Sequence, residues 1–368
     1  MRKLKVIQIL PTLNTGGVER GVLDFNKYLV KNGHDSFVIS NGGRQVKNLI
    51  EDGGNHIHLQ ISKKSIFTLF QAKKLADVIN EVSPDIVHIR SRVPAWVLQT
   101  SKLFFKNPRP IIFSTFHGLY SKPWYSKSMA YSDAIISISN TVTDYITSNY
   151  DVRDKEIIRI YRGCNTSKFN STHISESWLK QWNIDNPEMI NKKILLMPAR
   201  ITHWKGIEFF LELIKHLNNN DIFGLVIGKV AANKNRYLQT LKNSAKRLGL
   251  NDQNIKFLDA RPDIENLYKL SALVFNLSNK PEPFGRTIIE AAACGTSVIG
   301  WDRGGVSESL KKLNSSGAVK FGDMNELIGT TKRLLDSPDI INLPKEFTKD
   351  FQTSATIEFY KSLLSNSS

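Results

Sequence analysis

Short apolar runs alternate with longer amphipathic stretches along almost the whole chain, and this alternation constrains the fold most. Five runs in the first half read as buried strands, at residues 5–10, 35–40, 85–89, 110–116 and 134–139. Five more follow in the second half, at residues 193–199, 223–228, 255–259, 272–277 and 297–301. Strands that alternate with helices predict parallel sheets covered by helices, which is the α/β class.

Two such sets of elements indicate two domains, because 368 residues exceed what one hydrophobic core usually fills. Residues 164–190 are polar and rich in Asn and Ser, which suits a linker with a short helix. We therefore expect domains at 1–168 and 169–350, and a helix at 351–368 that packs back onto the first domain. The other helices are expected at residues 17–32, 65–82, 94–105, 140–149, 207–219, 235–248, 264–270 and 287–294.

The chain is basic, with 50 Lys and Arg against 34 Asp and Glu and a formal net charge of +16. Residues 1–184 hold +11 of this charge. Such an excess indicates anionic partners, among them nucleotide phosphates, lipid headgroups and nucleic acid. No RNA- or DNA-binding motif accompanies the charge, so nucleic acid is the least favoured partner.

Cysteine usage and hydropathy indicate a cytoplasmic protein. Cys164 and Cys294 follow no metal or redox spacing and are expected to be buried thiols. The first apolar run is about five residues long, shorter than a signal-peptide core. No stretch approaches the about 18 apolar residues of a spanning helix, so membrane contact would be peripheral. The helix at 65–82 carries aromatic residues beside Lys73 and Lys74, and it suits either such a contact or an ordinary solvated face.

The turn after the first strand contains a glycine pair, Gly16 and Gly17, directly before a helix. Free amides at a helix start can bind a phosphate, and glycine lets the backbone approach it closely. A plain tight turn is the alternative. The pattern is not G-x-G-x-x-G, which argues against a nicotinamide dinucleotide.

Three further side chains of the first domain follow strands. His117 ends "IIFSTFHG", where an imidazole could bond a reacting sugar or phosphate, although a lone histidine is more often structural. Arg90 and Arg92 end "DIVHIRSR" before a helix and could bind an anionic acceptor. Solvated surface arginines are the equal alternative.

In the second domain, "LLMPARITHWKG" places Arg200 and Lys205 on one loop between a strand and a helix. Two cations there can hold a diphosphate and neutralise the charge that grows on it as it leaves. Two unrelated surface cations are the alternative.

The stretch "PEPFGRTIIEAAACG" contains two glutamates eight positions apart. Glu282 lies in a loop, because Pro281 and Pro283 oppose a regular helix on either side of it. Glu290 lies within a helix whose first amides, near Gly285, can bind phosphate or sugar oxygens. No His or Asp completes a metal ligand set, so the two carboxylates are better suited to accept hydrogen bonds from ribose and sugar hydroxyl groups. Glu290 alone would read as an ordinary helix residue.

Taken in order, "GGVER", "FHG", "ARITHWKG" and "EPFGRTIIE" resemble the motifs of the retaining glycosyltransferases of family 4. The resemblance covers nearly the whole chain. It implies the GT-B fold, in which two Rossmann-like, doubly wound domains face a central cleft and a C-terminal helix crosses back to the N-terminal domain.

The resemblance also implies roles for residues of this chain. His117, Arg200, Lys205 and Glu282 would form the catalytic set, with the cations on the diphosphate and Glu282 on the transferred sugar. The donor-binding residues would be Gly16, Gly17, Phe284, Gly285, Arg286, Thr287 and Glu290, the last on the ribose. Arg90 and Arg92 would lie in the acceptor-binding domain. No metal and no other cofactor is expected.

The function implied is transfer of a sugar, with retention, from a nucleotide-diphosphate sugar to a glycan or lipid-linked acceptor. Lipopolysaccharide or a related cell-envelope polysaccharide is the expected product, and the inner face of the cytoplasmic membrane is the expected place of any peripheral contact. Two alternatives remain: a non-catalytic protein that binds a nucleotide-sugar or glycan on the same fold, and a sugar-nucleotide epimerase.

Overall fold

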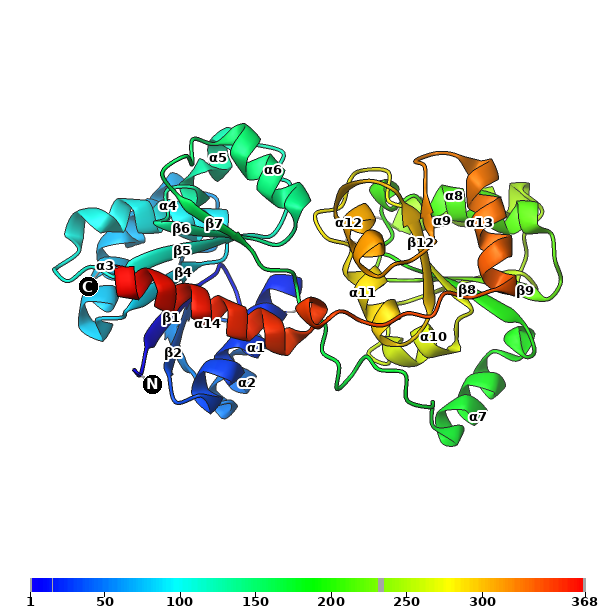
Figure 1. Ribbon diagram of the computed structural model, residues 1–368, viewed down its shortest axis with the longest axis horizontal. Helices are drawn as coiled ribbons and strands as arrows, with labels where there is room; N and C mark the ends of the chain where they lie inside the picture. The colour runs from blue at the N-terminus through cyan, green and yellow to red at the C-terminus, as the bar shows by residue number, and fades with distance from the viewer. Residues whose placement is uncertain (1, 15, 231–234, 367–368) are drawn as a thin grey trace. The chain divides into compact units, whose positions relative to one another are not determined.

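The computed structural model describes residues 2–14, 16–230 and 235–366 (Figure 1). The chain divides into two compact units, one made of Met1–Tyr161 with Lys349–Ser368 and the other of Arg162–Thr348. The chain enters the second unit at Arg162 and leaves it after Thr348. The Cys164 amide donates to the Phe347 carbonyl at 2.7 Å, and Phe169 packs against Tyr268, so the segment before residue 168 already belongs to the second unit.

The first unit is built on a parallel sheet with strand order β3-β2-β1-β4-β5-β6-β7. From β1 outward on both sides, this is the order of a doubly wound Rossmann-like sheet. Its strands are β1 Lys5–Ile9, β2 Asp35–Ser40, β3 Asn55–His58, β4 Ile86–Ile89, β5 Ile111–Phe116, β6 Ala134–Ser137 and β7 Glu156–Arg159. Its α-helices are α1 Gly17–Lys31, α2 Val46–Glu51, α3 Ala72–Val82, α4 Arg92–Ser101, α5 Pro123–Ser126, α6 Asn140–Asn149 and α14 Lys349–Asn366. Short 3-10 helices are η1 Ile66–Gln71, η2 Lys102–Phe104 and η3 Lys127–Met129.

Helix α14, the last element of the chain, is part of the core of this first unit. Tyr360 lies fully buried against Phe113 of β5, with ring centroids 4.6 Å apart, and against Phe25 of α1 at 5.8 Å. Burying several large side chains stabilises this attachment, at about 1.5–3 kcal/mol for each. The expected return of the C-terminal helix to the first domain is therefore confirmed.

The second unit repeats the same plan with six parallel strands in the order β10-β9-β8-β11-β12-β13. The strands are β8 Lys193–Pro198, β9 Ile222–Ile227, β10 Ile255–Leu258, β11 Leu273–Asn276, β12 Ser297–Trp301 and β13 Ala318–Val319. The α-helices are α7 Glu176–Asp185, α8 Ile207–Leu217, α9 Asn235–Arg247, α10 Ile264–Leu270, α11 Arg286–Ala293, α12 Gly304–Lys312 and α13 Met324–Asp336. The 3-10 helices are η4 Pro187–Met189, η5 His203–Lys205 and η6 Lys345–Phe347.

Both sheets confirm the predicted α/β class, and the ten predicted strands all exist. The sequence patterns missed β3, β7 and β13, which lie at the edges of the sheets and are short. They also missed α2, α5, α12 and α13. The predicted helix at 65–82 is two elements, η1 and α3. Cys164 and Cys294 are both buried, as expected.

Candidate active site

The order of strands fixes where the second unit can bind a ligand. Strands β8 and β11 are neighbours at the centre of the sheet, and the strand order runs outward in opposite directions from them. Ligands of doubly wound sheets bind at this switch point, beyond the carboxyl ends of the strands. Arg200 and Lys205 lie on the connection after β8, and Glu282 to Gly285 lie on the connection after β11. The topology therefore brings the two predicted donor motifs together.

Hydrogen bonds join these two connections. The amide of Asn279 donates to the Trp204 carbonyl at 2.7 Å, and its side chain donates to the His203 carbonyl at 2.8 Å. Gly206 has a φ of +67°, and a Cβ there would lie 1.9 Å from the Leu277 carbonyl oxygen. Only glycine fits such a close approach of two backbones. The glycine after Lys205 thus keeps the two loops in contact.

Lys205 and Glu282 form an ion pair between these loops. Lys205 Nζ lies 2.5 Å from Glu282 Oε1, and the Ser278 hydroxyl donates to the same oxygen. The side chains of Lys205 and Glu282 are 15% and 10% exposed. Within the described residues, all hydrogen bonds to this carboxylate end on Oε1. The Oε2 atom is therefore left to accept a hydrogen bond from a ligand hydroxyl.

Arg200 is exposed and lies near the same aromatic ring as Lys205. Its Cζ atom is 5.9 Å from the centroid of the Trp204 ring, and Lys205 Nζ is 4.2 Å from it. In the parts of the chain that the structure describes, no hydrogen bond from the Arg200 guanidinium is found. This cation therefore keeps its five N–H donors for an anion.

Helix α11 begins at Arg286, shortly after Glu282. Gly285 precedes it with a φ of +84°, which favours glycine. Phe284 is buried, and its carbonyl accepts a hydrogen bond from Ser309 at 3.1 Å. The Thr287 hydroxyl accepts from Asn276 at 3.2 Å. The positive end of α11 is thus held beside the ion pair, where it favours an anion.

A second glycine pair, Gly304 and Gly305, supports Glu282 and was missed by the sequence analysis. The Gly305 amide donates to the Glu282 carbonyl at 2.7 Å. A Cβ on Gly305 would lie 2.5 Å from Phe284 Cα, and one on Gly304 would lie 2.9 Å from the Glu282 carbonyl oxygen. Arg303 Nη2 also donates to the Ser278 carbonyl at 2.7 Å. The motif "DRGGVSE" was the available signal.

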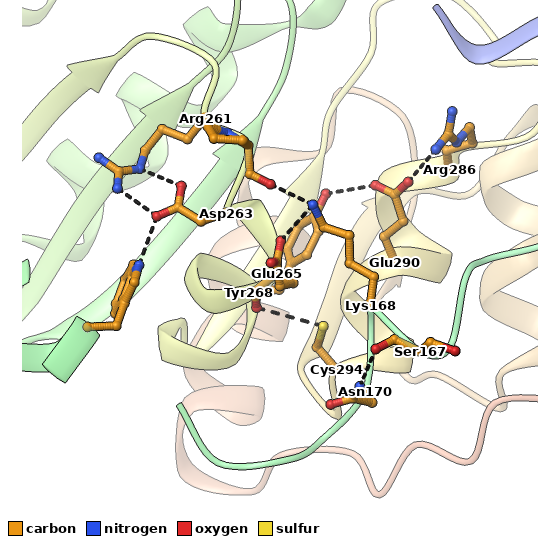
Figure 2. A network of polar contacts seen from close by, with 12 residues as sticks. Ser167, Lys168, Asn170, Arg261, Asp263, Glu265, Tyr268, Arg286, Glu290 and Cys294 are labelled. Atoms are coloured by element: carbon orange, nitrogen blue, oxygen red, sulfur yellow. Dashed lines mark hydrogen bonds and ion pairs between the residues drawn. The ribbon is translucent and has the colours of Figure 1, made fainter. Parts of the chain in front are cut away.

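Glu290 is held from two sides, as Figure 2 shows. Arg286 Nη2 lies 2.6 Å from its Oε1 atom, one helical turn away. The hydroxyl of the buried Tyr268 donates to its Oε2 atom at 3.3 Å. Burial, together with the charge of Glu290, raises the pKa of Tyr268 well above its usual value. Tyr268 therefore stays a neutral donor, a role that no sequence motif indicated.

Arg90 of the first unit is a core residue rather than a solvated one. It is 7% exposed and lies beyond the end of β4. It donates to Gln8 Oε1 at 2.7 Å and to Thr115 Oγ1 at 3.4 Å, and burial lowers its pKa to about 10. The solvated arginine that the sequence allowed is therefore wrong for Arg90, because tertiary packing covers it. Its role toward an acceptor stays a prediction.

The other predicted residues of the first unit lie after β1, β4 and β5. Gly16 is extended and precedes α1, with Gly17 as the first helical residue. His117 is half-buried, and its amide donates to the Tyr120 hydroxyl at 3.4 Å. Arg92 lies over the ring of Tyr120, 4.7 Å from its centroid. The strand order of this sheet changes direction between β1 and β4, which is its switch point. Predicted site residues therefore also surround the switch point of the first unit.

Comparison with known proteins identifies the family. The pattern of the family described as Glycosyl transferases group 1 matches residues 180–353, and that of Glycosyltransferase Family 4 matches residues 15–168. The chain belongs to these glycosyltransferases.

A crystal structure of a glycosyltransferase from Rickettsia africae is similar over the whole of both chains, with a TM-score of 0.88 and 29% identity. N-acetyl-alpha-D-glucosaminyl L-malate synthase of Bacillus anthracis is 23% identical, over 92% of this chain and 89% of that protein. The fold is also that of Anabaena Alr3699/HepE in complex with UDP-glucose, at a TM-score of 0.78 and 19% identity, over 98% of this chain and 100% of that one. The GT-B fold expected from the sequence is confirmed.

The described part of this glycosyltransferase contains no group of three or more His, Cys, Asp or Glu side chains that could hold a metal ion. None of its described helices is long and apolar enough to cross a membrane. What the second unit does offer is two cations and a helix start for an anion, with two carboxylates for hydroxyl groups. A diphosphate that links a ribose and a sugar presents this combination of groups.

Proposed function

We propose that this glycosyltransferase moves a sugar from a nucleotide-diphosphate sugar to an acceptor, with retention of configuration and without a metal ion. The observation that carries the proposal is the Lys205–Glu282 pair at the switch point of the second unit, with Arg200 beside the same tryptophan. Positive charge fixed in advance where a diphosphate leaves stabilises the transition state.

In this proposal the donor is held at both of its ends. Arg200, Lys205 and the start of α11 bind the diphosphate, and Glu282 Oε2 accepts a hydrogen bond from a hydroxyl of the sugar. Glu290 accepts hydrogen bonds from the ribose hydroxyls. The amide of Gly17, beside Gly16, and His117 in the first unit are included as donor contacts on the resemblance of their motifs alone.

The chemical step breaks the bond between the sugar's anomeric carbon and the phosphate oxygen. The acceptor oxygen forms its bond to that carbon from the same face, and the acceptor's proton passes to the departing phosphate. No protein nucleophile is required. Lys205 starts paired with Glu282, so it can turn part of its charge toward the phosphate as negative charge develops there.

For the acceptor we propose a glycan or lipid-linked molecule of the cell envelope, of the lipopolysaccharide or a related polysaccharide pathway. The net charge of +16 and its concentration in residues 1–184 support an anionic acceptor, and peripheral contact with an anionic membrane on its cytoplasmic face. The Bacillus anthracis relative is named as the synthase of an L-malate compound. In the transfer assay, malate therefore serves as the small-acid control for the envelope acceptor.

A panel of UDP-, GDP- and ADP-sugars tests the donor. A bound donor raises the melting temperature according to its affinity, in the presence of EDTA as well as with added magnesium. NMR of the product from the stabilising donor then gives the anomeric configuration. Inversion would reject the retaining part of the proposal, and activity that disappears with EDTA would reject metal independence.

A further inference from the structure

The first unit contains a cavity of about 740 Å³ that the donor site does not use. It lies between η1, the start of α4 and α5, and its volume is within the range of about 300–1,000 Å³ typical of small-molecule sites. Its apolar wall includes Ile66, Leu69, Val93, Trp96, Val97 and Trp124.

The helix η1 beside this cavity turns a polar side chain inward and apolar side chains outward, the reverse of an ordinary surface helix. Thr68 is 7% exposed and faces inward, whereas Ile66, Phe67 and Phe70 are 74%, 71% and 75% exposed. Trp124 of α5 is also 68% exposed at the cavity. A surface in contact with water alone would place these side chains the other way round. Aromatic and aliphatic side chains held outward beside a pocket indicate a site that an apolar partner covers.

The cavity is also cationic. Lys63, Lys64, Arg92 and Lys122 line it, and no Asp or Glu does so. Lys63, Lys64 and Lys122 are exposed, and they form no ion pair with any described residue. Arg92 is held between the rings of Tyr120 and Tyr125, at 4.7 and 5.5 Å from their centroids. The cavity therefore combines apolar walls with positive charge and suits an anion attached to an apolar chain.

The cavity is built by defined contacts rather than by loose loops. Trp96 Nε1 donates to the Tyr125 carbonyl at 2.8 Å, which fixes α5 against α4. The Thr68 hydroxyl donates to the Lys63 carbonyl at 2.9 Å, and the Ser65 hydroxyl accepts from the Phe67 amide at 3.3 Å. These bonds hold η1 in the orientation that exposes its aromatic residues.

We propose that this cavity binds the phosphate-bearing end of a lipid in a membrane leaflet. The phosphate would lie among Lys63, Lys64, Arg92 and Lys122, the adjoining chain would contact Ile66 and Trp124, and Phe67 and Phe70 would enter the leaflet. A second copy of this chain is a poor occupant, because its cavity carries the same positive charge. The further claim that this lipid is the acceptor of the sugar, or carries the acceptor, rests on the proposed function. The binding itself is independent of transfer.

The test is sedimentation of the full chain with phosphatidylcholine vesicles, with and without phosphatidic acid, at physiological ionic strength. We expect saturable binding only to vesicles that contain phosphatidic acid. Decyl phosphate, used below its critical micelle concentration, should release the protein, whereas decanol or inorganic phosphate at the same concentration should not. Release by inorganic phosphate alone would show that an anion suffices and would overturn the lipid assignment.

Two variants locate the binding surface. Lys63→Glu with Lys64→Glu should weaken vesicle binding by about tenfold or more, because each lysine near an anionic surface contributes appreciably. Trp124→Ala should weaken it by about tenfold through lost apolar contact. These positions are exposed, so folding should be unaffected, and thermal unfolding checks this. Lys74→Glu is the control, because Lys74 is exposed in the neighbouring α3 and does not line the cavity.

An absence of vesicle binding would overturn the proposal. So would a loss of vesicle affinity in Lys74→Glu that equals, per reversed charge, the loss in the Lys63/Lys64 variant. Stabilisation by nucleotide-sugars is measured in the same variants to separate the two proposals. Donor binding without vesicle binding would reject only the lipid site. Vesicle binding without any response to nucleotide-sugars would reject only the proposed transfer.

Discussion

Lys205 Nζ lies 2.5 Å from Glu282 Oε1, and the two residues come from connections that follow the two central strands of one sheet. Each charge is nearly buried, and each needs the other before a donor is bound. The pair therefore links the stability of the second unit to the recognition of its ligand.

Replacing one member of this pair should cost both stability and activity. Glu282→Gln leaves the Lys205 ammonium without its carboxylate, and loss of one partner of a fully buried pair costs about 3–5 kcal/mol. Because these side chains are 10–15% exposed, we expect a somewhat smaller loss in urea unfolding. Transfer should fall by about a hundredfold or more.

The double variant Lys205→Met with Glu282→Gln provides the control. It removes both charges, so much of the lost stability should return while activity stays low. Stability losses that simply add in the double variant would show that the two side chains do not interact energetically.

Arg200 should affect the donor and not the fold. Its guanidinium is exposed and makes no described hydrogen bond, so Arg200→Ala should leave the melting temperature without ligand unchanged. Loss of charged hydrogen bonds to a diphosphate should weaken nucleotide-diphosphate binding by roughly ten- to a hundredfold. Calorimetric titration measures this. Unchanged affinity in Arg200→Ala would remove this residue from the donor site.

Tyr268 is predicted to act as a positioning residue, through Glu290. Tyr268→Phe removes the hydroxyl that donates to Glu290 Oε2 at 3.3 Å and keeps the buried ring. Loss of one such bond corresponds to roughly a two- to tenfold effect. If Glu290 binds the ribose in ground state and transition state alike, KM for the donor should rise and kcat should not change. A change confined to kcat would contradict this assignment.

The stability of the first unit should depend on pH through His88. Burial, the nearby Arg90 and His117 hold the pKa of His88 well below its usual value, and its ring contacts Thr115 and Tyr360. The unfolded chain therefore binds more protons below about pH 6.5, so stability falls as pH decreases from 7 to 5, by at most about 1.4 kcal/mol per pH unit from this group.

The variant His88→Gln should be less stable at pH 7, because it disturbs a buried bond to α14, but its melting temperature should vary less with pH. Burial also lowers the pKa of His34 and His56, so some dependence should remain. Melting curves at several pH values measure both effects. A pH dependence identical to that of the parent chain would contradict the role of His88.

Local patterns were sufficient to predict the elements on which the donor residues lie. The helix predicted at 140–149 is α6 with the same bounds, and Ile207 begins α8 as expected. Prolines around Glu282 restrict the backbone, and glycines at positions 206 and 285 permit the positive φ that their turns adopt, so these loops could be recognised from the sequence.

The missed features depend on tertiary contacts. Tyr268 reaches Glu290 across 22 positions, and Gly305, in the first turn of α12, supports Glu282. Arg90 could be a surface residue by its sequence, but it is buried, and it interacts with Phe25 of α1 and with Tyr360 of α14, which comes from the far end of the chain. The reversed polarity of η1 was missed because residues 65–82 were expected to form one continuous helix, whereas the structure has η1 followed by α3.

The decisive experiment for the proposed transfer measures the release of nucleoside diphosphate from the panel of nucleotide-sugars by the parent chain and by Lys205→Ala, in EDTA. We predict that the parent chain releases nucleoside diphosphate from at least one donor, faster with envelope extract as acceptor, and that Lys205→Ala lowers this rate by about a hundredfold or more. Full activity in folded Lys205→Ala, or no binding and no release with any donor, would contradict it.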